Sequence, residues 1–124
     1  MDEEANKPLS IGEEGVGRWL DRKEVLSSTV SQLRKDLSLG ADEIVEPHAD
    51  EGAFEALRAQ VLVALDRWQS TDSTALSRAI NRIDLTEAQV NAAMDRGGFG
   101  ELAGAVVLRA LQKVLTRLRH AGRY

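Results

Sequence analysis

The sequence predicts an all-α protein, a single small bundle of four to five helices, of which three are long and two are short. Apolar residues recur at steps of three, four or seven, and typical helix starts and stops separate the segments that carry them. Apart from the ambiguous pair Ile44 and Val45, no stretch shows the alternation typical of strands. A chain of 124 residues, 43% of them hydrophobic, suits one core.

The chain divides into two parts. Residues 1–16 contain Pro8, Gly12 and Gly15, a surplus of acid over base and few apolar side chains, so they bury little surface to offset the entropy lost on ordering. We expect a flexible acidic N-terminal tail over residues 1–16, dispensable for folding, and a helical bundle domain over residues 17–121.

The first two long helices are expected over residues 18–39 and 51–69. In the first, two rows of apolar residues recur every seven positions, and Gly40 suits the left-handed residue that ends a helix. The acidic stretch 40–50, with Pro47, is a connection, in which Ile44 and Val45 are candidates for contact with the core. The second helix has the clearest stripe, and three of its residues should be among the most buried: Leu57, Val61 and Leu65.

Two short helices follow. The first carries an apolar face over residues 76–83, after cap-type residues at 70–73. The second begins at Glu87, because Thr86 and Gln89 form a capping box and Leu85 can pack on Val90 as a hydrophobic staple. Its buried face is predicted to comprise Val90, Ala93 and Met94, and Gly97–Gly98 should end it.

The third long helix is expected over residues 100–119. Its apolar face is wide, which indicates a central position in the bundle. Gly100 and Gly104, four residues apart, are expected to let a neighbouring backbone approach closely.

Composition argues against several function classes. The chain has no Cys and two His, so we expect no metal site, no cofactor and no catalytic activity. His48 lies among Glu46, Asp50 and Glu51, without the spacing of a metal site, and we interpret it as a solvated residue. The N-terminus lacks the features of a secretory signal, and no apolar run approaches the roughly 20 residues that span a bilayer. We therefore expect a cytoplasmic protein that does not associate with membranes.

Charge is unevenly distributed along the chain. Residues 1–66 hold 15 acidic and 7 basic side chains, whereas residues 67–124 hold 5 acidic and 9 basic ones. Basic residues recur on one side of the last helix, which gives four candidate partner-binding residues: Arg109, Lys113, Arg117 and His120. Such a row also complements the negative end of the helix dipole without any partner, so both interpretations stay open.

The function expected from these features is a small helical protein-interaction module, such as an adaptor, regulator or assembly subunit, which binds another protein or itself. Two helices carry more apolar surface than one stripe requires, notably at Leu62 with Val63 and at Leu108 with Leu115. The alternative is nucleic-acid binding through the basic face of the last helix or through the short helix pair 74–95. That pair resembles a helix-turn-helix, whose base-reading side chains would be Gln89, Asn91 and Arg96.

Overall fold

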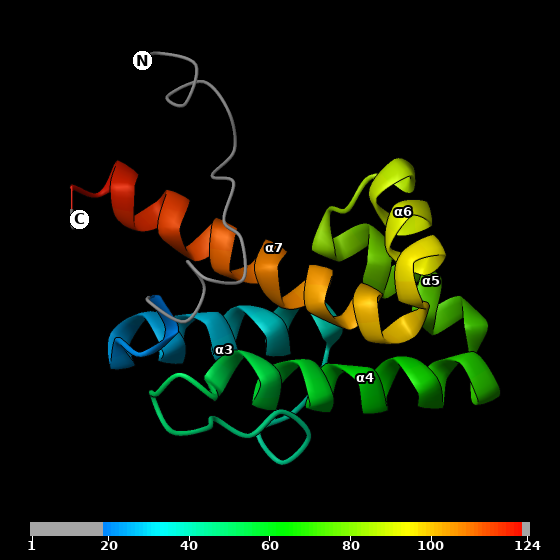
Figure 1. Cartoon of the computed structure of the whole chain (residues 1–124), viewed down its shortest axis with the longest axis horizontal. Helices are drawn as coiled ribbons and strands as arrows, with labels where there is room; N and C mark the ends of the chain where they lie inside the picture. The colour runs from blue at the N-terminus through cyan, green and yellow to red at the C-terminus, as the bar shows by residue number, and fades with distance from the viewer. Residues whose placement is uncertain (1–18, 123–124) are drawn as a thin grey trace.

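The helical periodicity of the sequence corresponds to five α-helices in the computed structural model, which describes residues 19–122 and contains no strand within them. The all-α class is therefore confirmed, whereas the expected flexible tail at residues 1–16 lies outside the described residues. Following the labels of Figure 1, the helices are α3 (Lys23–Leu37), α4 (Ala53–Thr71), α5 (Ser73–Ile83), α6 (Glu87–Gly97) and α7 (Phe99–His120).

The three long helices build the core. The C-terminal helix α7 packs along both α4 and α3, so that two neighbours cover its apolar face (Figure 1). Leu57, Val61 and Leu65 are fully buried, as their spacing predicts. Leu111 and Leu115 of α7 are buried with them, and each such side chain contributes about 2 kcal/mol of transfer free energy. Leu115, which the sequence suggested as surplus apolar surface, therefore belongs to the core.

The contact between α4 and α7 depends on two glycines. A Cβ at Gly104 would lie 3.6 Å from the Phe54 ring and 3.5 Å from Arg58, and Arg58 also donates a hydrogen bond to the Gly100 carbonyl at 3.3 Å. The prediction of a close backbone is thus corrected: the glycines leave room for side chains of α4, which lie across the first turns of α7.

The first predicted helix, over residues 18–39, is interrupted and ends early. Its first position lies outside the described residues, residues 19–20 are helical, a turn follows at residues 21–22, and α3 begins at Lys23. It ends at Leu37 because Ser38, not Gly40, takes the left-handed conformation, with φ of 55°. This turn directs Leu39 back into the core. In the connection that follows, Ile44 is fully buried and its carbonyl accepts two hydrogen bonds from Arg34, whereas Val45 is exposed.

The two short helices form a corner at the end of the bundle where α7 begins. The Asp72 carboxylate caps α5, accepting a hydrogen bond from the Ala75 amide at 3.1 Å. Helix α5 packs against α4 and α3, whereas α6 packs chiefly against α7 (Figure 1). The helices extend over Ser73–Ile83 and Glu87–Gly97, slightly longer than expected, and Gly98 ends α6 with φ of 75°.

Among residues 19–122, no helix has the length and apolar character needed to cross a membrane.

Candidate functional site

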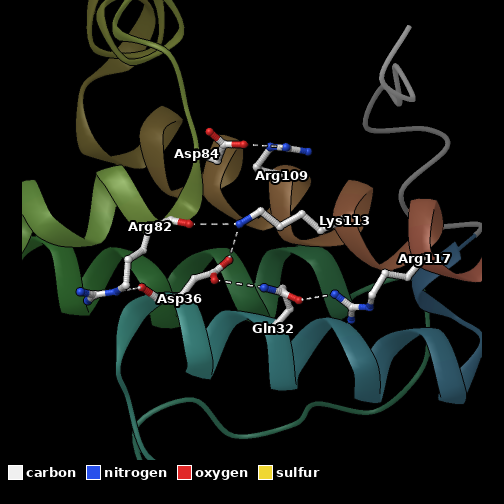
Figure 2. A network of polar contacts seen from close by, with 7 residues as sticks. All are labelled: Gln32, Asp36, Arg82, Asp84, Arg109, Lys113 and Arg117. Atoms are coloured by element: carbon white, nitrogen blue, oxygen red, sulfur yellow. Dashed lines mark hydrogen bonds and ion pairs between the residues drawn. The ribbon is translucent and has the colours of Figure 1, made fainter. Parts of the chain in front are cut away.

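The basic row predicted from the sequence lies along α7, and its first two members face acidic groups of the same chain. Arg109 contacts the Asp84 carboxylate at 3.2 Å, at the turn between α5 and α6. Lys113 contacts the Asp36 carboxylate of α3 at 2.8 Å and donates a second hydrogen bond to the Arg82 carbonyl of α5 at 3.2 Å (Figure 2). These two cations therefore connect α7 to α3, to α5 and to the α5–α6 turn.

Asp36 is the centre of this network. Its side chain is 9% exposed and that of Lys113 is 19% exposed, so the ion pair is largely removed from water. Asp36 also accepts a hydrogen bond from Gln32 at 3.0 Å, and its backbone carbonyl accepts one from Arg82 at 2.9 Å (Figure 2). A largely buried carboxylate is tolerable only with such partners, and the removal of one partner leaves the other uncompensated. The network thus joins three helices.

The end of the row differs from its middle. Arg117 donates a hydrogen bond at 2.6 Å to the amide oxygen of Gln32, a neutral group (Figure 2). His120 is exposed in the last turn of α7. Within the described part of the chain, no ion pair forms at Arg117, Arg119 or His120. The positive charge of this helix end is therefore available to an acidic group.

A second feature, which the sequence did not reveal as a site, is an open groove in the α5–α6 corner with a volume of about 540 Å³. One wall comes from α5, the other from α6, and the first turn of α7 closes one side. Its lining comprises the buried Leu102, six other apolar residues and three polar residues. The six apolar residues are Leu76, Ile80, Leu85, Val90, Met94 and Phe99. The three polar residues are Ser77, Asn81 and Glu87. We call this surface the corner groove.

The groove corrects the expected burial of α6. Ala93 is fully buried, as predicted, but Val90 is half-buried and Met94 is 39% exposed. The capping box itself is confirmed, since the Gln89 amide donates to the Thr86 hydroxyl at 3.1 Å and the Gln89 side chain accepts from the Thr86 amide at 2.9 Å. The local signals thus located the helix correctly, whereas its apolar face exceeds the area that its neighbours cover.

The two walls of the groove are joined by a short turn and are anchored differently. Asp84 adopts the left-handed conformation with φ of 73°, a role that glycine commonly fills, and it separates α5 from the cap of α6. Helix α5 is anchored by the buried Ala79 and Ile83 and by the bonds of Arg82 to the network. Helix α6 has one buried residue, Ala93. One wall is therefore fixed by three long helices, and the other depends on its contact with α7.

The acidic connection before α4 shows structural contacts. Glu46 accepts a hydrogen bond from Ser27 at 2.8 Å, and Asp50 accepts one from the Gly52 amide at 2.8 Å. The pKa of Glu43 is lowered by a hydrogen bond from the Gly40 amide and by Arg67. Among residues 19–122, no group of three or more His, Cys, Asp or Glu side chains is placed to hold a metal ion.

No known protein family matches the chain, and neither curated proteins nor solved structures give a significant match.

Proposed function

We propose that this chain is a non-catalytic, cytoplasmic protein-interaction module that binds an amphipathic helix of another protein in the corner groove. The observation that carries the proposal is the groove itself, in which six apolar residues from three helices and the α5–α6 turn line an opening of about 540 Å³. An apolar groove between two helices is a surface into which the apolar face of an amphipathic helix can dock.

The chemistry of the lining favours one kind of occupant. Glu87 is the charged residue of the lining, and Ser77 and Asn81 add hydrogen-bonding groups at the α5 wall. An apolar helix face would fill the floor, as helices do in grooves between two other helices, with hydrogen-bonding or basic groups at its edges. An acidic ligand is disfavoured, because no lining residue is basic.

Nucleic-acid binding is the weaker alternative. Of the three side chains that would read bases, Gln89 is engaged in the capping box and Arg96 contacts Glu101 at 3.3 Å. Arg109 and Lys113 contact Asp84 and Asp36, as described above. Phosphate-driven binding weakens steeply with salt, so we expect no retention of DNA or RNA in a filter assay even at low salt.

The test places a positive charge in the groove. Met94→Lys changes a residue that is 39% exposed, so the fold should tolerate it, while a helix with an apolar face would meet a charge it cannot pair. Val63→Lys is the matched control, since Val63 is 66% exposed on α4 and does not line the groove. Proteins retained from native extract by each immobilised variant are compared with those retained by the original chain.

We expect at least one protein that the original chain and Val63→Lys retain and that Met94→Lys loses by tenfold or more. Equal retention by both variants would contradict the groove as the site. If the immobilised chain retained a second copy of itself instead, the occupant of the groove would be that second copy and not another protein.

A further inference from the structure

A second groove lies at the opposite end of the bundle, between the start of α3 and the end of α7. It has a volume of about 570 Å³, and its lining comes almost entirely from α7: Ser28, Val114, Thr116, Arg117, Leu118, His120 and Ala121. Its apolar floor consists of the buried Val114 and the half-buried Leu118, while Arg117 and His120 supply exposed basic groups. We call this surface the terminal groove.

The charge of the terminal groove favours an acidic occupant. As shown above, Arg117 is bonded to a neutral amide, and neither it, Arg119 nor His120 forms an ion pair among residues 19–122. All three residues lie in the last turn of α7, where their positive charge also complements the negative end of the helix dipole. The basic residues of the lining, Arg117 and His120, both lie on α7, so an acidic occupant would place its carboxylates against α7.

We propose that residues 9–16 of this chain bind in the terminal groove. Their sequence, Leu-Ser-Ile-Gly-Glu-Glu-Gly-Val, has the matching composition, because Leu9, Ile11 and Val16 suit the apolar floor and Glu13 and Glu14 suit Arg117 and His120. The segment carries no basic residue. This pairing is independent of the corner groove and of its proposed partner.

The chain reaches the groove easily. Ser28 lies opposite the end of α7, because Gln32 contacts Arg117 while Asp36 contacts Lys113, so α3 and α7 run antiparallel. From Lys23, where α3 begins, to Ser28 the helical rise amounts to roughly 8 Å. The eight residues from Ile11 to Trp19 span up to about 27 Å when extended. Figure 1 shows the start of α3 and the end of α7 at the same end of the bundle.

The test uses a single spin label on the full chain. Since the protein has no Cys, Ser10→Cys attaches one nitroxide, and its paramagnetic broadening of amide resonances reports which residues lie near the label. We expect the strongest broadening at residues 114–121. A label at the exposed Asn91 on α6 is the control and should leave those resonances sharp.

Neutral variants distinguish binding from mere tethering. Glu13→Gln with Glu14→Gln should reduce the broadening at residues 114–121 at least threefold. Glu3→Gln with Glu4→Gln removes the same charge outside the proposed segment and should change it little. Equal effects of the two pairs would show unspecific attraction, and no effect of either pair would show a tethered but unbound segment; both results overturn the proposal.

Discussion

The unit of α3, α4 and α7 and the corner of α5 and α6 differ in how completely their apolar faces are covered. In the three-helix unit, α7 packs against both α4 and α3, and residues such as Leu57 and Leu111 are fully buried. In the corner, α6 packs chiefly against one neighbour, and Val90 and Met94 keep part of their surface exposed. The same helical periodicity thus produces a closed core in one region and an open groove in the other.

This difference shows that an apolar stripe fixes where a helix forms but not what covers it. How much of the apolar face is buried depends on the number of neighbouring helices. In the corner, this number follows from the turn at Asp84 and from the hydrogen bond by which Arg82 anchors α5 to α3. Stability should therefore reside mainly in the three long helices, whereas binding should reside in the corner. The following predictions compare the two regions, beginning with the largest effect.

Removal of a core side chain should have the largest effect. Leu57→Ala leaves a cavity among the three long helices and should lower the free energy of unfolding by about 2 to 5 kcal/mol. Val90→Ala in the corner should cost less than about 1 kcal/mol, because that side chain already meets solvent. Urea denaturation of both variants measures this contrast, and equal losses would remove the distinction between the two regions.

Neutralising the network should have the next largest effect. Asp36→Asn leaves the Lys113 ammonium without its counterion in a largely buried position and should cost about 1.5 to 3 kcal/mol. Asp84→Asn is the matched control, since the Asp84 side chain is 74% exposed and its pair with Arg109 should contribute less than about 1 kcal/mol. If both variants melted at the same temperature, Lys113 would not hold the helices together as described.

Loss of the cap should affect α6 locally. Thr86→Ala removes the hydroxyl that accepts the Gln89 amide and should cost about 1 kcal/mol. Hydrogen exchange should then accelerate at the amides of α6 and remain unchanged in α4, because α6 packs chiefly against a single neighbour, α7. Thr116→Ala, at an exposed position within α7, serves as the control that removes no cap. Uniform acceleration in all helices would instead show that α6 unfolds only with the whole domain.

The smallest effect is expected at the exposed ion pair itself. Arg109→Ala should lower stability by less than about 1 kcal/mol, and the loss should shrink at high salt, because water and ions screen the contact with Asp84. Thermal melts at low and high salt measure it. A loss as large as that of Asp36→Asn would mean that the row stabilises the fold along its entire length.

Local signals in the sequence predicted much of the fold. The stripe of α4, the capping box at Thr86 and the Gly98 stop depend on neighbouring residues, and each was found where expected. The partners of the basic row could not be predicted, because Asp36 and Lys113 are 77 residues apart and meet only in the packed structure. The corner groove was missed for the same reason, since the half-exposure of Val90 depends on how α5 and α6 pack against the rest of the chain.

Site-specific photo-crosslinking tests the central claim most directly. A benzophenone side chain replaces Met94 in one variant and Val63 in another, and both proteins are irradiated in native extract. The account predicts a protein adduct at position 94, mapped to an amphipathic helix of the partner, and little or none at position 63. Equal adducts at the two positions, or adducts with nucleic acid at position 94, would contradict it.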